Sequence, residues 1–172
     1  MIEPRRFSDT RGYFAEVFSE RALEAVTGGL KFVQDNVSHS VNAGTVRGLH
    51  YQVGANAQAK LIRVLKGSII DVVVDLRRSS PTFGKSEAVE LSADNFRMLY
   101  IPVGFAHGFE TLVPGVEVHY KVSAYYSPKD ERGLIWNDPK LGINWRTDPK
   151  MAILSDKDRI LPTLADAVDL FE

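Results

Sequence analysis

Short runs in which apolar and polar positions alternate recur along the chain, and this spacing is typical of β-strands with one buried face. The cleanest example covers residues 116–124, where Val118, Tyr120 and Val122 share one face while polar side chains occupy the other. The segment therefore predicts a strand that carries Tyr120 on its apolar face.

Other apolar segments predict the remaining strands. Residues 60–76 contain two β-branched runs, and their separation at residues 66–68 around a glycine predicts a hairpin. Residues 88–91 and 98–101 predict two more strands, with a polar turn between them.

Helical spacing is scarce. Residues 19–26 predict one short helix, with Ser19 as its N-cap and Gly28 ending it, and the tail after Ser155 predicts another turn or two. Many short strands joined by Gly, Pro, Asn and Asp turns favour an all-β sandwich or barrel, with a jelly roll as the leading candidate. The loop-rich C-terminal third is predicted to wrap this barrel. Because no linker or repeat divides the chain, residues 1–172 are expected to form a single domain.

Composition narrows the classes of function. A formal net charge of −1, with 25% charged residues, gives no basic field that would attract nucleic acid or an anionic membrane. The chain has no cysteine, which excludes disulfides, thiolate metal sites and a cysteine nucleophile. The N-terminus lacks the apolar stretch of a signal peptide, and the longest apolar run is interrupted by Asp71 and Asp75. We therefore expect a soluble, cytoplasmic protein.

The first candidate chemistry lies after a glycine-containing turn, where Arg47 and His50 stand three residues apart. Ten residues later, Lys60 shares a strand face with Ile62 and Val64. A lysine at a strand edge usually extends its amine to water. Inside a barrel, a lysine is costly unless a charge or a developing charge meets it, so a buried Lys60 would indicate function.

The second candidate is His107, which lies between Phe105 and Phe109 on one alternating face. A histidine in this setting is either a hydrogen-bonded core residue or a functional group. The pattern Pro102-x-Gly-x-x-His107 resembles the second signature of the cupin superfamily, in which this histidine points into the barrel.

The cupin resemblance also indicates whether the chain has the ligands for a metal site. Metal-binding cupins supply His-x-His and then a glutamate from their first signature. Here the stretch is His50-Tyr51-Gln52, followed by Lys60 where an acidic ligand would be expected. An ammonium group repels a divalent ion, and two imidazoles alone are a poor ligand set, so we expect no metal.

Two later segments are ambiguous by themselves. Tyr120 is either a core residue whose hydroxyl has found a partner or a general acid. Residues 154–158 are densely charged and would ordinarily form a solvated turn or the start of a helix.

Together these motifs resemble the dTDP-4-dehydrorhamnose 3,5-epimerase family and its 4-keto-sugar epimerase relatives, from about residue 7 to residue 162. Each motif alone is weak, but nine in the same order are specific. The matching segments are residues 9–16, 34–36, 47–52, 58–60, 80–84, 102–109, 120–121, 136–139 and 154–158. The resemblance implies a cupin-like jelly-roll β-barrel with a few short helices. It also implies that dTDP-4-dehydro-6-deoxyglucose is epimerised at C3 and C5 without a cofactor.

The resemblance implies a role for each matching residue. His50 is the general base, and Asp158 holds and polarises it. Tyr120 is the proton donor on the opposite face of the sugar, and Lys60 lies near the C4 oxygen. The residues implied to bind the nucleotide sugar are Arg47, His107, Gln34, Asn36, Glu131 and Lys157. Apart from the resemblance, Tyr126 is a candidate stacking surface for the base, expected to be thymine. Arg11 and Glu16 match a strand that reaches the neighbouring subunit's site in the family, which implies a homodimer.

These residue types suit the chemistry. A hydrogen beside a ketone is acidic because the carbanion delocalises onto oxygen, so a cation near that oxygen stabilises the enolate. Histidine titrates near neutral pH, and tyrosine stays protonated there, which suits a base and an acid on opposite faces. Three alternatives remain open at this point: a mono-epimerase of a related sugar, a metal-dependent cupin isomerase or dioxygenase, and a non-catalytic nucleotide-sugar-binding barrel.

Overall fold

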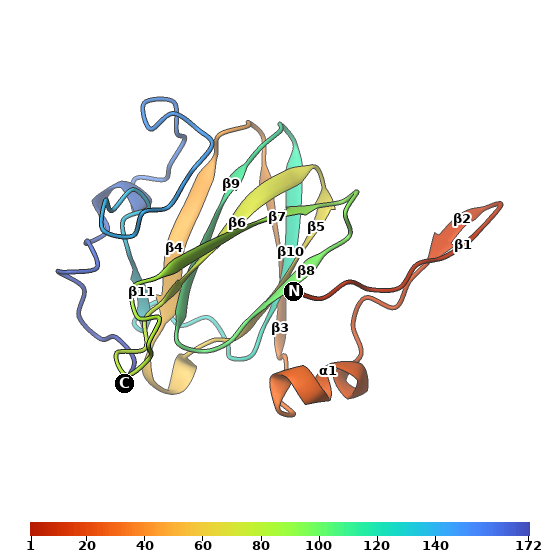
Figure 1. Cartoon of the computed structure of the whole chain (residues 1–172), viewed down its shortest axis with the longest axis horizontal. Helices are drawn as coiled ribbons and strands as arrows, with labels where there is room; N and C mark the ends of the chain where they lie inside the picture. Colours follow the sequence, from red (N-terminus) through yellow and green to blue (C-terminus); the bar gives the residue numbers. More distant parts are fainter.

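The computed structural model describes residues 1–172 and consists mainly of antiparallel β-strands (Figure 1). Two sheets, here called sheet I and sheet II, form the body of the molecule. Sheet I has the order β3 (Gln34–Ser40), β10 (Val116–Val122), β5 (Lys60–Lys66), β8 (Met98–Ile101). Sheet II has the order β11 (Glu131–Gly133), β4 (Val46–Gln52), β9 (Phe105–Thr111), β6 (Ser68–Asp75), β7 (Ser86–Ser92).

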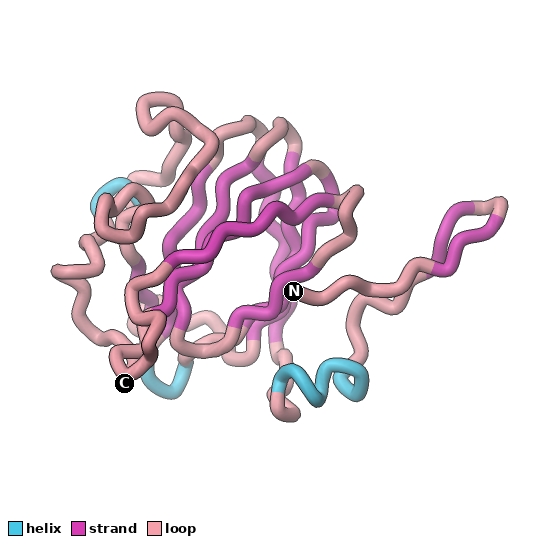
Figure 2. The backbone as a smooth tube through the Cα atoms, in the orientation of Figure 1, coloured by secondary structure: helices cyan, strands magenta, loops and turns pink.

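The remaining elements are short. Strands β1 (Phe7–Asp9) and β2 (Gly12–Phe14) form a two-stranded arm that extends away from the sheets, and α1 (Glu20–Thr27) follows it (Figure 1). Two single turns of 3-10 helix, η1 (Gly54–Asn56) and η2 (Asp158–Ile160), complete the chain. The predicted all-β class with a few short helices is confirmed, and the pairing leaves two separate sheets that face each other (Figure 2).

The predicted helix is confirmed together with its caps. The Ala22 N–H donates to Ser19 Oγ at 3.4 Å, and Gly28 adopts a left-handed conformation with φ of 65°. No helix in the structure is both long enough and apolar enough to cross a membrane. In the tail, the predicted helical turns are reduced to the one 3-10 turn of η2.

The hairpin predicted at residues 66–68 is wrong. Strands β5 and β6 are separated by Gly67 alone, but they do not pair, because β5 pairs with β10 and β8 while β6 pairs with β7 and β9. Gly67 instead carries the chain from sheet I to sheet II. Its φ is +79°, and a Cβ there would lie 2.8 Å from Val116 Cγ2, so the crossing requires glycine.

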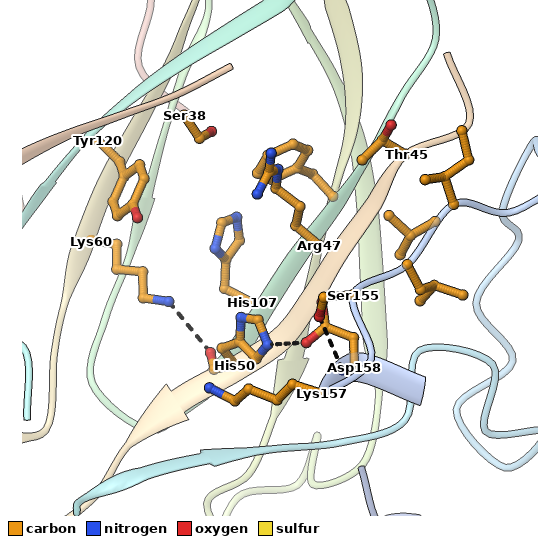
Figure 3. A pocket seen from close by; sticks show the side chains of 14 residues that line it. Ser38, Thr45, Arg47, His50, Lys60, His107, Tyr120, Ser155, Lys157 and Asp158 are labelled. Carbon is orange, nitrogen blue, oxygen red and sulfur yellow. Dashed lines mark hydrogen bonds and ion pairs between the residues drawn. The ribbon is translucent and has the colours of Figure 1, made fainter. Parts of the chain in front are cut away.

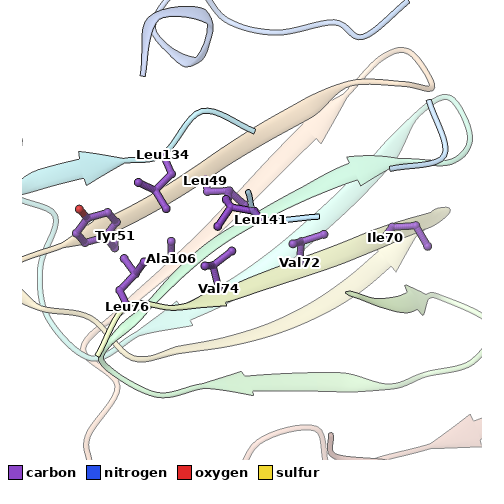
Figure 4. Close-up of a cluster of buried hydrophobic side chains, with 9 residues drawn as sticks. All are labelled: Leu49, Tyr51, Ile70, Val72, Val74, Leu76, Ala106, Leu134 and Leu141. Carbon is purple, nitrogen blue, oxygen red and sulfur yellow. The ribbon is translucent and has the colours of Figure 1, made fainter. Parts of the chain in front are cut away.

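The hydrophobic core has two parts, one on each side of sheet II. An inner cluster between the sheets includes Ile62, Ile69 and Phe109. An outer cluster packs the C-terminal third against sheet II, with Leu134 and Leu141 lying on the strand residues (Figure 4). Burying each of these side chains contributes about 1.5–3 kcal/mol. The C-terminal third therefore wraps the sheet as predicted.

Two buried carboxylates fix the C-terminal third, Glu110 by tying it to sheet II and Asp138 by joining two of its segments. Glu110, on the outer face of β9, accepts the backbone N–H groups of Arg146 at 2.5 Å and Thr147 at 3.0 Å. Asp138 accepts the N–H of Leu164 at 2.8 Å. Because these bonds are buried, they hold the path of the chain toward η2, which approaches β4.

Candidate active site

A cavity of about 510 Å³ opens between the two sheets and the η2 segment (Figure 3). A second hollow of about 230 Å³ shares three of its lining residues, His50, Lys60 and Tyr120. These three side chains therefore lie between the two hollows, where a ligand filling both would pass.

The imidazole of His50 is held by a buried carboxylate from a distant part of the chain. Its Nε2 lies 2.7 Å from Asp158 Oδ1, across 108 residues of sequence, and Asp158 is 3% exposed. Burial alone would raise the pKa of Asp158, but the hydrogen bond and charge of His50 and the Gly48 N–H outweigh it and lower that pKa. Since Nε2 is engaged, Nδ1 is the ring nitrogen left for a ligand in the cavity.

Glycines allow this arrangement. The register between β4 and β9 shifts between Arg47 and His50, and a Cβ on Gly48 would lie 2.7 Å from Gly108 Cα. Gly48 also has a φ of +116°, and its N–H donates to Asp158 Oδ2 at 3.4 Å. The close approach of the two strands thus brings the imidazoles of His50 and His107, paired in register, to one end of the cavity.

Lys60 does not extend to water. It is 9% exposed, and its Nζ donates to the carbonyl oxygen of His50 at 3.4 Å. Burial lowers the pKa of Lys60 to about 8, while Asp71 and Glu131 act in the opposite direction. No group of three or more His, Asp and Glu side chains is arranged to hold a metal ion.

Tyr120 faces Lys60 from the neighbouring strand β10, with its hydroxyl turned into the cavity (Figure 3). The two strand neighbours Val118 and Val122 are buried, as the alternating pattern predicts. Burial raises the pKa of Tyr120, with Glu131 adding to the effect and Arg47 opposing it. The phenol therefore keeps its proton at neutral pH.

His107 is buried and lines the cavity, and its partner is a residue that the sequence patterns did not single out as functional. Its Nε2 lies 2.9 Å from Oδ1 of Asp71, which is 0% exposed. These two atoms form no hydrogen bond, so the contact between the two side chains is electrostatic. Burial lowers the pKa of His107, Asp71 opposes this, and Lys60 and His50 add to it. The sequence feature that could have indicated Asp71 is its charge at an inward-facing position of an otherwise apolar strand.

The predicted substrate-binding residues divide into two groups around this centre. Arg47 lines the larger cavity, where its guanidinium donates to Ser40 Oγ at 3.1 Å and to the His39 carbonyl oxygen at 2.9 Å. Gln34 and Asn36 line the smaller hollow, joined by a hydrogen bond of 2.8 Å.

Glu131 connects the remaining predicted residues at the mouth. It accepts a hydrogen bond from the Tyr126 hydroxyl at 2.7 Å and pairs with Lys157 Nζ at 2.5 Å. Burial would raise the pKa of Glu131, but these two partners and the charge of His50 lower it.

Arg11 and Glu16 are not brought to this cavity. Both are exposed: Arg11 lies at the tip of the N-terminal arm, where it pairs with Asp9 at 2.6 Å, and Glu16 follows β2. Neither lines the cavity of its own chain.

The chain is similar in sequence and structure to one family of known proteins. The family model described as dTDP-4-dehydrorhamnose 3,5-epimerase matches residues 1–166. The dTDP-4-dehydrorhamnose 3,5-epimerase of Sinorhizobium fredii is 49% identical over 96% of this chain and 85% of its own length. The Bacillus anthracis enzyme of that name, solved with TDP and PPi bound, has a TM-score of 0.90 and 54% identity over 94% of this chain and 91% of its own. The Legionella pneumophila dTDP-6-deoxy-D-glucose-3,5-epimerase, in complex with dTDP-4-keto-L-rhamnose, has a TM-score of 0.93 and 41% identity, covering 99% and 90%.

Proposed function

Because the chain belongs to the dTDP-4-dehydrorhamnose 3,5-epimerase family and has that isomerase activity, we propose that His50, Lys60 and Tyr120 perform its proton transfers. The substrate is dTDP-4-dehydro-6-deoxyglucose, whose ketone at C4 makes the hydrogens at C3 and C5 removable. The observation that carries the proposal is the placement of the base and the acid on opposite sheets across one cavity.

His50 is the proposed base. Its Nδ1 takes the proton from carbon, and the electron pair of the C–H bond moves into the enolate with its charge on O4. The ring then becomes an imidazolium whose Nε2–H donates to the Asp158 carboxylate at 2.7 Å. Because this charge-assisted bond strengthens as the ring becomes positive, Asp158 favours proton removal.

Lys60 is proposed to stabilise the enolate. A buried ammonium group is poorly solvated, so its interaction with a developing negative charge on O4 is stronger than it would be in water. Loss of one such preorganised donor typically lowers the rate by about 10²- to 10³-fold.

Tyr120 is proposed to return a proton to the opposite face of the carbon. As the new C–H bond forms, the enolate electrons leave O4 and the ketone is restored with inverted configuration. The resulting tyrosinate regains its proton from solvent, and the imidazolium of His50 releases its own. The same cycle at the second carbon completes the double epimerisation.

The nucleotide half of the substrate is proposed to bind in the flanking hollows. The guanidinium of Arg47 suits a pyrophosphate oxygen. His107 binds on the sugar side, while Gln34, Asn36 and Glu131 bind farther along the ligand. Lys157 and Tyr126 close the mouth, with the ring of Tyr126 beside the base. The match to relatives solved with TDP, PPi and a dTDP-linked keto sugar supports this assignment.

The N-terminal arm is proposed to act in a homodimer. Phe7, Tyr13 and Phe14 on the arm are exposed, and the arm lies away from its own cavity (Figure 1). In a dimer, Arg11 and Glu16 would complete the neighbouring subunit's site. Analytical ultracentrifugation of the full chain and of Arg11→Ala, with turnover measured for both, tests this assignment.

The central test is turnover of dTDP-4-dehydro-6-deoxyglucose in D₂O, followed by NMR. Deuterium incorporated at both C3 and C5 supports double epimerisation. His50→Ala should abolish exchange while dTDP binding, measured by calorimetry, is kept. His119→Ala, which removes an imidazole from the outer face of β10, is the matched control and should remain active. Near-normal exchange by His50→Ala would refute the assigned base, and activity lost to a chelator would refute the metal-free reaction.

A further inference from the structure

The proposed mechanism leaves one buried charge unused. Asp71 lies in the middle of β6, is 0% exposed, and neither of its carboxylate oxygens accepts a hydrogen bond. Its position faces the space between the sheets, in line with Ile69 of the inner apolar cluster. An ionised carboxylate in such surroundings is costly unless a positive charge compensates it.

Two nitrogen groups can supply that compensation. The closer one is His107, whose Nε2 is 2.9 Å from Asp71 Oδ1. Burial, however, favours the neutral form of that imidazole. The second is Lys60, which is buried in the same interior and donates only to a backbone carbonyl at 3.4 Å. A carboxylate without a donor and an ammonium without a carboxylate partner therefore share one water-poor space.

We propose that Asp71 is a positioning residue that acts as the counter-charge for Lys60, with His107 in contact with the carboxylate. The enolate needs a cation at its oxygen, and a lysine that had lost its proton would not supply one. Asp71 keeps the ammonium form populated, and it is not among the residues that line the cavity. The catalytic part of this inference rests on the proposed role of Lys60.

The electrostatic balance agrees with this geometry. Burial lowers the pKa of Lys60 to about 8, and Asp71 is the largest influence that opposes the decrease. Glu131 acts in the same direction, but its carboxylate is already engaged by Lys157 and Tyr126. The contact that Asp71 makes is with His107, and burial favours the neutral form of that imidazole.

The strands around Lys60 differ in the groups that they present to it. On β8 its register partner is Ile101, which carries no charge, and β3 presents only amide and hydroxyl side chains to the cavity. The titratable or charged groups that line the two hollows with Lys60 are Arg47, His50 and Tyr51 on β4, His107 on β9, Tyr120 on β10, Tyr126 after β10, Glu131 on β11, and Lys157 and Asp158 at η2. Asp158 is engaged by His50.

The direct test is the titration of Lys60 in Asp71→Asn, which removes the charge and keeps the shape. The Cε resonance of Lys60 in ¹³C-lysine-labelled protein, identified by its loss in Lys60→Met, reports this titration without reference to turnover. We expect the pKa of Lys60 to fall by roughly one unit or more, the usual effect of losing a nearby opposite charge in a buried site. An unchanged titration would overturn the proposal, whatever the activity.

The kinetic test uses the pH dependence of kcat. If the pKa falls from about 8 to about 7, the ammonium fraction drops roughly eightfold at pH 8.5 but only about 1.1-fold at pH 6. Asp71→Asn should therefore lose activity mainly on the alkaline side. Glu110→Gln neutralises an equally buried carboxylate on the outer face of β9. It should not shift the alkaline limb of the pH profile of kcat. A loss that is uniform across pH would indicate a structural role and would overturn the positioning role.

A reciprocal measurement covers the case in which Asp71→Asn does not fold. Because coupling between charges acts in both directions, Lys60→Met should raise the pKa of His107, measured by ¹H NMR of its ring. A His107 titration identical to that of the unchanged protein would show that the three groups are not coupled. The titrations of Lys60 and His107 could shift as expected while Lys60→Met retains full turnover. That result would support Asp71 as the counter-charge but would refute the proposed catalytic role of Lys60.

Discussion

The pairing of His50 with Asp158 gives the sharpest quantitative prediction. Asp158→Asn removes the carboxylate charge but keeps the size of a side chain that is 3% exposed. A hydrogen bond to a charged group contributes about 1.5–3 kcal/mol, and here it matters most when the imidazole has become an imidazolium. Since about 1.4 kcal/mol corresponds to a tenfold change in rate, kcat should fall about 10- to 150-fold.

The assay should separate this loss from weaker binding. An interaction made only in the transition state lowers kcat and kcat/KM equally and leaves KM unchanged. We therefore expect dTDP affinity within about threefold of the unchanged protein. Asp156→Asn, an exposed carboxylate two residues earlier, is the control and should behave normally. Retention of more than half of the original kcat, or a loss confined to KM, would refute the assignment of Asp158.

The same substitution has a consequence for stability that depends on pH. The pKa of Asp158 is lowered in the folded protein, so its ionised form stabilises the fold at pH values above the unfolded value of about 3.9. That contribution is lost as the pH falls through the folded pKa. The difference in free energy of unfolding between the unchanged protein and Asp158→Asn should thus shrink as the pH falls below about 3.9.

Three further predictions follow from particular contacts. Tyr120→Phe removes the proton donor, so inverted product should form about 10²- to 10⁴-fold more slowly in an NMR assay, while exchange through the base continues; normal product formation would exclude Tyr120 as the acid. Gly108→Ala places a Cβ 2.7 Å from the Arg47 carbonyl oxygen, so thermal unfolding should show a loss of about 1–3 kcal/mol together with reduced turnover, and an unchanged Tm would contradict the close approach. Asp75→Asn removes a buried carboxylate that accepts two hydrogen bonds from the Arg77 side chain, which lowers its pKa. Urea unfolding should show the variant to be less stable at pH 7, with the deficit fading below the unfolded pKa of about 3.9, and an equal deficit at pH 3 would count against an ionic origin.

Local signals predicted local structure well. The helix was predicted with its caps because Ser19 and Gly28 act on their immediate neighbours. The strand around Tyr120 was predicted because alternation reports which side chains face inward. The hairpin failed for the opposite reason, since a turn at Gly67 is compatible with pairing or with crossing to another sheet. Which of these occurs depends on partners far away in the sequence.

Only part of the site could be predicted from the sequence. No spacing rule joins His50 to a carboxylate 108 residues away, and the contact was expected solely from the family resemblance. In the sequence alone, Asp71 is only an interruption of an apolar run. Its significance depends on the inward parity of its strand and on the lysine that crosses the same interior from sheet I. The relation between Asp71 and Lys60 can be recognised only from the three-dimensional arrangement of both sheets.

The two-sheet architecture itself explains why this fold suits inversion. Retention of configuration could be achieved by one group that removes and returns a proton, and such a group could sit on a single strand. Inversion requires a second group on the far side of the carbon, and the distance between the two must be kept while the sugar lies between them. Here His50 belongs to sheet II and Tyr120 to sheet I, so their separation is set by the packing of buried side chains between the sheets. Lys60 can serve both half-reactions because O4 is common to them, and its strand lies beside the acid rather than the base.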